Sequence, residues 1–270
     1  MKNKALIYRF LKKRIKMLET LINTHQSHSN VKFFHLIRVE IKKIRSIIQM
    51  IDLYSNKTVS QKSTKPIDKI YKAAGKVRSM QIEKELLDMK FQKYPLLDYH
   101  KRLSSKLKNA KTAFNKTLTE NIEWNKIKNK LYTQINHTNF NDYKKYLKRK
   151  SKEIKEIISM KIIPEKKYHE LRTMLKNLTY HLKMGYHKFS KTAIQEWIKI
   201  SNLLGKWHDL VSLKKSLLKF VSKNIKSSEE NRQLISVITN INAKSEKMII
   251  KINSELKTLF PIKMNDCTFI

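Results

Sequence analysis

The sequence contains very few residues that break helices. Only three glycines and four prolines occur among its 270 residues, a scarcity that argues against turn-rich β structure. Apolar residues instead recur at spacings of three and four, as amphipathic helices require. We therefore expect an all-α protein with roughly nine or ten helices. The expected breaks fall near residues 26–31, 55–66, 94–96, 136–141, 161–165, 185–189 and 223–229.

Features of an exported or membrane-spanning protein are also lacking. Cys267 is the single cysteine, so no disulfide can form within the chain, which is typical of a reducing compartment. The first 22 residues have an amphipathic pattern and lack the continuous apolar segment of a signal peptide. No apolar run of about 18 residues occurs. We expect a cytoplasmic protein without a membrane span.

Acidic residues are scarce, and the chain is strongly basic. Its 59 Lys and Arg residues against 22 Asp and Glu give a net charge of +37. Such an excess repels itself and favours an anionic partner, such as nucleic acid, an anionic membrane surface or a polyphosphate. Only nine of the basic residues are arginine, so in a lysine-rich chain the arginines are the informative positions. Four of them lie in the motifs described below: Arg38, Arg45, Arg78 and Arg172.

No arrangement typical of an enzyme or a metal site is apparent. The chain has no glycine-rich phosphate loop, no Ser/His/Asp constellation and no clustered carboxylates for metal-dependent phosphoryl transfer. His181 and His187 are six residues apart, a spacing that does not fit zinc. His208 and Asp209 would point about 100° apart on a helix, and we interpret Asp209 as a residue of a first helical turn. We expect no catalysis, no metal and no cofactor.

A twelve-residue pattern occurs twice, in residues 35–46 (HLIRVEIKKIRS) and 169–180 (HELRTMLKNLTY). On a helix, the cationic side chains of the first copy fall within about 80° of arc beside an apolar stripe. They are His35, Arg38, Lys42 and Arg45. In the second copy His169, Arg172 and Lys176 have the same angles. Each helix should therefore present a row of cations on the shoulder of its core face, where it would line a groove.

The duplication extends to a second segment around a glycine. Residues 71–79 (YKAAGKVRS) and 202–209 (NLLGKWHD) each place a lysine directly after the glycine, and then an apolar residue. We interpret Gly75 and Gly205 as positions where one helix ends and the next begins, because glycine adopts the left-handed turn without a Cβ penalty.

The repeat divides the chain into two halves, at residues 1–138 and 139–270. We expect each half to form an antiparallel helical bundle and the two to be related by a pseudo-two-fold axis. The lysine-rich, weakly patterned stretch 139–161 is the candidate hinge between them.

A row of cations of this length suits a polyanion. His35 and Arg45 would be separated by about 15 Å along the helix, which matches several successive phosphates better than one small anion. Arginine binds phosphate oxygens in bidentate fashion, and lysine supplies a point charge. Bound phosphates favour protonated histidine, so we expect binding to strengthen as the pH falls from about 8 to 6. A lone histidine is more often a core residue, but two at matching repeat positions favour ligand contact.

These motifs resemble those of the CHAD family, the conserved histidine α-helical domain. The matching segments are residues 35–45, 73–78, 169–180 and 204–210, in order along nearly the whole chain. The resemblance implies one domain made of two four-helix bundles about a pseudo-two-fold, with a basic central channel that binds inorganic polyphosphate without catalysis. The ligand contacts that it implies are His35, Arg38, Lys42, Lys43, Arg45, Arg78, His169, Arg172 and Lys176. Four further candidates come from the same segments and helix: Lys76, Lys206, His208 and Lys183.

The second copy departs from the family pattern. Thr179 stands where members usually have arginine, and Asn177 replaces a cation, while Lys183 is expected to restore a charge one turn later. These departures raise the question whether the second half binds as tightly as the first. Storage, association with polyphosphate granules and regulation of another protein are all roles that the resemblance leaves open.

Two other functions remain open at this stage. The charge alone also fits a helical protein that binds nucleic acid without sequence preference. Such a protein would be expected to interleave aromatic residues along its basic row, and only Tyr180, at the edge of the second row, does so. A helical scaffold for protein partners is the third alternative.

Overall fold

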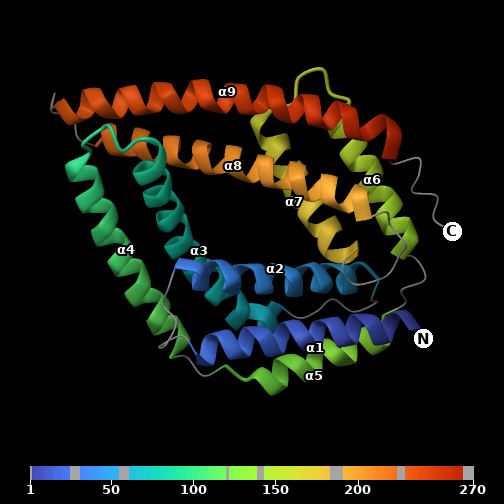
Figure 1. Cartoon of the computed structure of the whole chain (residues 1–270). Helices are drawn as coiled ribbons and strands as arrows, with labels where there is room; N and C mark the ends of the chain where they lie inside the picture. Colours follow the sequence, from blue (N-terminus) through green and yellow to red (C-terminus); the bar gives the residue numbers. More distant parts are fainter. Residues whose placement is uncertain are drawn as a thin grey trace.

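The computed structural model describes residues 2–24, 31–54, 61–119, 122–138, 143–182, 191–223 and 229–263. Within these ranges the chain forms nine α-helices and no strand, so the all-α prediction is confirmed. The helices are α1 (Lys2–Asn23), α2 (Val31–Tyr54), α3 (Gln61–Lys90), α4 (Leu97–Leu118), α5 (Trp124–His137), α6 (Tyr143–Ile158), α7 (Glu165–Leu182), α8 (Lys191–Val221) and α9 (Glu229–Lys263) (Figure 1). None of the described helices is both long enough and apolar enough to cross a lipid bilayer.

The apolar periodicity of the sequence determines which face of each helix is buried. In α1, side chains spaced by three or four residues, from Ile7 to Ile22, are buried in the core. All seven expected breaks coincide with boundaries between helices, whereas the break between α4 and α5 was not expected. Residues 143–158, within the candidate hinge, are helical as α6.

The interpretation of the two glycines as helix ends is wrong. Gly75 lies in the middle of α3 and Gly205 in the middle of α8, and both helices continue without interruption. Asp209 is consequently not in a first turn, because α8 begins at Lys191. Each glycine instead faces an arginine of a neighbouring helix, Arg38 at Gly75 and Arg172 at Gly205.

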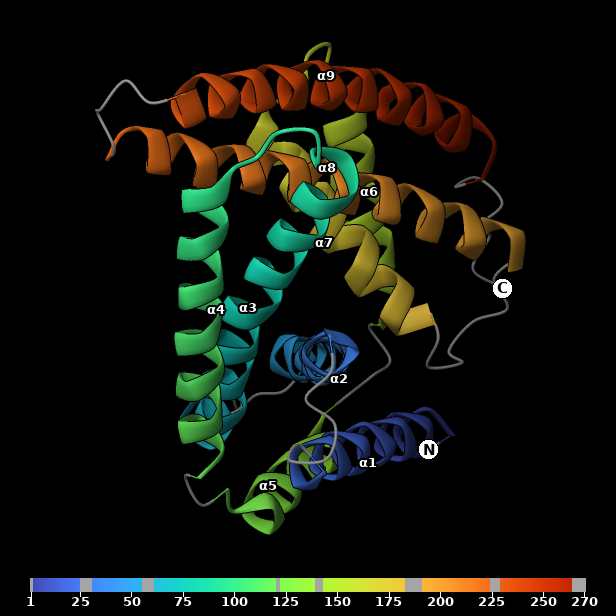
Figure 2. The ribbon, with the colours of Figure 1, turned by 60° about the vertical axis from the view of Figure 1, so that its left-hand side comes forward.

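The helices are layered so that the two repeated helices meet in the middle of the molecule. Helices α8 and α9 run side by side at one end, and α1, α2 and α5 pack together at the other (Figures 1 and 2). Helix α4 bridges these ends: Glu230 of α9 accepts hydrogen bonds from its first backbone amides, and Phe114 near its other end packs on Phe33 and Phe34 of α2. Helix α2 contacts α7.

The hydrophobic core is shared between the two sequence halves. Its larger cluster takes buried residues from helices of both halves, from Ile7 in α1 to Leu256 in α9. A smaller cluster joins the end of α3 and the start of α4, through Leu87 and Tyr99, to α8 and α9, through Leu217 and Leu234. Burial of this shared apolar surface holds α2 and α7 in a fixed relation.

Candidate anion-binding site

Cations from both copies of the repeat gather where α2 meets α7. The pKa of Lys42 on α2 is lowered to about 7, first because burial removes its amine from water and then because Lys176 and Arg172 of α7 are close. The pKa of Lys176 is lowered to about 8 by burial and by Arg172. Asp209 of α8 acts in the opposite direction on both amines. The positive charges therefore exceed what the surrounding protein neutralises.

The repeated histidines lie close to these cations. Partial burial lowers the pKa of His35, and the positive charges of Arg78 and Lys176 lower it further. His169 stacks near His208 of α8, with ring centroids 4.9 Å apart. Burial and the proximity of His208 lower the pKa of His169. We call the whole group the cation cluster, and it consists of His35, Arg38, Lys42, Arg78, His169, Arg172, Lys176 and His208.

Arg38 is held in place by α3. Its Nη1 donates a hydrogen bond to the backbone carbonyl of Tyr71 at 3.1 Å, and its Nη2 to the Tyr71 hydroxyl at 3.3 Å. The guanidinium also lies over the Tyr71 ring, 4.3 Å from its centroid. A Cβ atom at Gly75 would overlap Nη1 of Arg38. Glycine is therefore needed here for the close approach of the arginine to the helix.

Arg172 approaches α8 in the corresponding way but is held less firmly. A Cβ atom at Gly205 would lie 3.5 Å from Nε of Arg172, which is an ordinary van der Waals contact. The same Nε is buried and has no hydrogen-bond partner among the described residues. An unsatisfied buried donor is costly, and a bound anion could satisfy it.

Two of the predicted contacts, Lys43 and Arg45, are engaged in ion pairs. The amine of Lys43 lies 2.5 Å from Glu40, a carboxylate only 6% exposed that also binds Arg14 of α1 at 3.1 Å. Arg45 donates to Asp68 of α3 at 2.9 and 2.5 Å, and its guanidinium lies 3.9 Å from the centroid of the Tyr71 ring. These interactions tie α2 to α1 and α3.

The remaining predicted residues lie elsewhere or outside the described part. Lys76 and Lys206 are exposed, and each is about 160° around its helix from the cluster residue two positions later, Arg78 or His208. Lys183 and His187 are outside the described residues.

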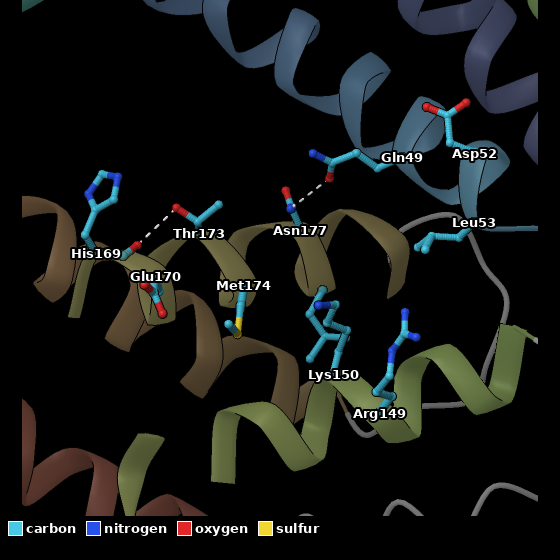
Figure 3. Close-up of a pocket in the computed structure, with 11 residues that line it drawn as sticks. Gln49, Asp52, Leu53, Arg149, Lys150, His169, Glu170, Thr173, Met174 and Asn177 are labelled. Carbon is cyan, nitrogen blue, oxygen red and sulfur yellow. Dashed lines mark hydrogen bonds between the residues drawn. The ribbon is translucent and has the colours of Figure 1, made fainter. Parts of the chain in front are cut away.

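A cavity of about 560 Å³ lies between α2, α6 and α7, and Arg172 is not among the residues that line it (Figure 3). His169 stands at one end of it, and Arg149 of α6 lines the other. Asn177, at the position where a cation was expected, donates a hydrogen bond to Gln49 of α2 at 3.2 Å in its wall. Asn177 therefore links the two repeated helices.

Sequence reasoning did not find Tyr71 and Asp209 as partners of the cations. Tyr71 lies four residues before Gly75, so both face the same side of α3 and both meet Arg38. That spacing was the available signal.

Among the described residues no group of three His, Cys, Asp or Glu side chains could hold a metal ion.

The geometry defines an all-α protein with a cation cluster between duplicated helices, and comparison with known proteins identifies its family. The CHAD domain model matches residues 13–218, and the chain belongs to the CHAD family. The fold is similar to the CHAD domain from the plant Ricinus communis, with a TM-score of 0.74, 13% identity, and 94% of this chain and 91% of that chain covered. It is also similar to PptA from Streptomyces chartreusis, with a TM-score of 0.72, 8% identity, and coverage of 94% and 99%. No curated protein matched the sequence.

Proposed function

We propose that this CHAD protein binds inorganic polyphosphate along the cation cluster and does not catalyse a reaction on it. The observation that carries the proposal is the pair Lys42 and Lys176, whose pKa values fall to about 7 and 8 beside Arg172. Such crowding of cations destabilises the free protein, and a ligand with closely spaced negative charges would relieve it. The proposed site extends along both repeated helices, so it suits a chain of phosphates.

The proposed architecture of the site follows the sequence repeat. Residues 1–138 and 139–270 would each supply one four-helix bundle of a single CHAD domain, related by a pseudo-two-fold, with a basic channel between them. The cluster residues would line the channel. Lys43 and Arg45 would support it from their ion pairs, and Lys76, Lys183 and Lys206 would act at its periphery.

Nucleic acid is the competing ligand, and the environment of Tyr71 argues against it. Proteins that bind single strands without sequence preference stack bases on aromatic rings. The ring of Tyr71 is already covered by the guanidinium groups of Arg38 and Arg45. Tyr180 is largely buried, and burial raises the pKa of its hydroxyl. The cluster therefore offers phosphate contacts without a free stacking platform.

A competition experiment tests the choice of ligand. Labelled long-chain polyphosphate is bound to the protein at about 0.15 M salt and displaced with unlabelled polyphosphate or with single-stranded DNA of equal total charge. We expect DNA to be the weaker competitor by at least about tenfold, or 1.4 kcal/mol. Equal or better displacement by DNA would contradict polyphosphate as the preferred ligand.

A further inference from the structure

A second basic cavity lies apart from the cation cluster, between the C-terminal part of α3, the N-terminal part of α4 and the C-terminal part of α8. Its volume is about 230 Å³. None of its lining residues belongs to the cluster or to the repeated histidine helices. It is smaller than the roughly 300–1,000 Å³ of pockets for drug-sized ligands, so its occupant must be compact.

One wall of this cavity is a rigid hydrogen-bonded group from three helices. Tyr99 of α4 is 4% exposed, and its hydroxyl contacts Glu83 of α3 and lies 2.8 Å from the hydroxyl of Ser216 on α8. Ser216 donates to the same carboxylate oxygen of Glu83 at 2.8 Å. Burial and the charge of Glu83 raise the pKa of Tyr99, which therefore stays protonated. The wall is formed before any ligand arrives.

Three cations line the cavity against the single carboxylate of Glu83. They are Arg102 and Lys106, one turn apart on α4, and Lys219 on α8. None of the ion pairs among the described residues involves any of the three. The guanidinium of Arg102 lies 5.1 Å from the centroid of the Phe220 ring, a contact that restricts its position. The cavity thus has an excess of positive charge on two facing helices.

We propose that this cavity binds one compact phosphate-class anion, of the size of orthophosphate or pyrophosphate. Arg102, Lys106 and Lys219, which line the cavity, would neutralise it and donate charge-assisted hydrogen bonds to its oxygens. The anion can be a free small molecule or the terminal group of a polyphosphate chain. The site is independent of the cluster, so it stands even where the proposed function fails.

Pyrophosphate titration by calorimetry tests the proposal, with the full chain and its variants. Arg102→Gln combined with Lys219→Gln should weaken pyrophosphate binding by at least about tenfold. The control of equal charge is Lys101→Gln combined with Lys108→Gln, which removes two exposed cations of α4 that do not line the cavity. Thermal unfolding followed by circular dichroism checks that each variant is folded. The control should retain pyrophosphate binding.

Two results would overturn the proposal: no saturable pyrophosphate binding by the wild-type protein, or binding that Arg172→Gln removes and the double variant does not. Titration with long-chain polyphosphate then distinguishes a free small anion from the terminal group of a polyphosphate chain as the occupant of the cavity. If the site takes a chain end, the double variant also weakens binding of the long chain. If it takes a free anion, pyrophosphate still binds when long-chain polyphosphate has saturated the cluster.

Discussion

The two copies of the repeat hold their first arginine differently. In the first copy Tyr71 binds Arg38 and stacks on it, while Asp68 pairs with Arg45. In the second copy, residues at the same distances before the glycine are Ser201 and Ile198. Ser201 is 4% exposed, and its hydroxyl has no hydrogen-bond partner among the described residues. The first copy is therefore preorganised by the protein, and the second leaves Arg172 free for a ligand.

The replacement of arginine by Thr179 belongs to the same difference. Thr179 stands where the first copy has Arg45, and it donates a hydrogen bond to the carbonyl of Leu175 at 2.7 Å within its own helix. Arg45 itself is engaged by Asp68 and Tyr71. The second copy therefore lacks both the arginine and the partners that hold Arg45 in the first copy. We expect this difference to affect the structural support of the site more than its contacts with the ligand.

Among single substitutions, the largest expected effect concerns the two cluster arginines. Arg38→Ala and Arg172→Ala should each weaken polyphosphate binding by about tenfold or more and reduce its salt dependence. Their effects on stability should differ. Arg38→Ala loses two hydrogen bonds and a cation–π contact, and should lower the free energy of unfolding by about 1–2 kcal/mol. Arg172→Ala should leave it unchanged or raise it, because a buried unpaired Nε is removed.

Urea denaturation and calorimetric titration of both variants check this prediction. Lys148→Ala, an exposed cation on α6, is the control and should change neither quantity appreciably. Equal destabilisation by Arg38→Ala and Arg172→Ala would show that the two copies support their arginines in the same way.

The next largest effect should distinguish the two glycines. Alanine favours an α-helix over glycine by about 1 kcal/mol. Gly205→Ala should therefore stabilise the protein slightly and leave binding intact, since its Cβ meets Arg172 at an ordinary distance. Gly75→Ala should lose this gain and weaken polyphosphate binding by about tenfold, because Arg38 must move. Calorimetric titration and thermal unfolding of the pair measure both effects, and identical behaviour would contradict the proposed role of Gly75.

A partial recovery of stability is expected when the support of the first copy is rebuilt in the second. Thr179 is buried, so Thr179→Arg alone should destabilise the fold by about 1–3 kcal/mol. Adding Ile198→Asp should recover part of that loss, as Asp68 does for Arg45. A double-mutant cycle in urea measures the coupling. Strict additivity of the two substitutions would mean that positions 179 and 198 do not form a pair equivalent to Arg45 and Asp68.

The pH dependence should be the most gradual effect. The folded-state pKa values of Lys42 and Lys176, about 7 and 8, are below the ordinary 10.5. The unfolded chain thus binds more protons, and the free energy of unfolding should rise from about pH 7 to about pH 10. Bound polyphosphate favours the charged amines, so binding should take up protons and tighten as the pH falls from about 9 to 7. His35 and His169 should extend this trend below pH 7.

Titrations in two buffers of different ionisation enthalpy measure the proton uptake directly. Lys42→Met should remove most of the uptake near pH 7, and Lys148→Met should leave it unchanged. Binding that releases protons, or that is independent of pH in this range, would contradict the lowered pKa values as a feature of the binding site.

Much of the fold could be predicted because the signal is local. Apolar spacing of three and four gave the helices, and angles on a helix placed His35, Arg38 and Lys42 on one side of α2. The break between α4 and α5 carries no glycine or proline, so the pattern alone did not indicate it. The roles of Gly75 and Gly205 depend on a neighbouring helix that is distant in sequence. A glycine in a helix and a glycine at a helix end look alike without that neighbour.

The predicted site residues fall into two groups: cations that pair with a carboxylate of the protein, and cations that do not. Rows of cations are visible in sequence, but their counterions are not when they come from another helix. Arg45 lies within about 80° of arc of the other cations of its row, yet Asp68 and Tyr71 of α3 engage it. Lys43 is held by Glu40, three residues earlier in the same helix, and Glu40 is itself anchored by Arg14 of α1. Their contribution to binding remains a prediction, and we expect it to be smaller than that of Arg172.

The central claim is that cations of both copies form one site for polyphosphate between α2 and α7. It is tested most directly by titrating long-chain polyphosphate into the double variant Lys42→Gln with Lys176→Gln, at about 0.15 M salt. The double variant Lys148→Gln with Lys257→Gln, which removes two exposed cations, is the matched control. We predict that the cluster variant loses at least about a hundredfold in affinity and the control less than about threefold. Equal losses in both would show that the ligand responds to the overall charge of the protein, and would contradict the account.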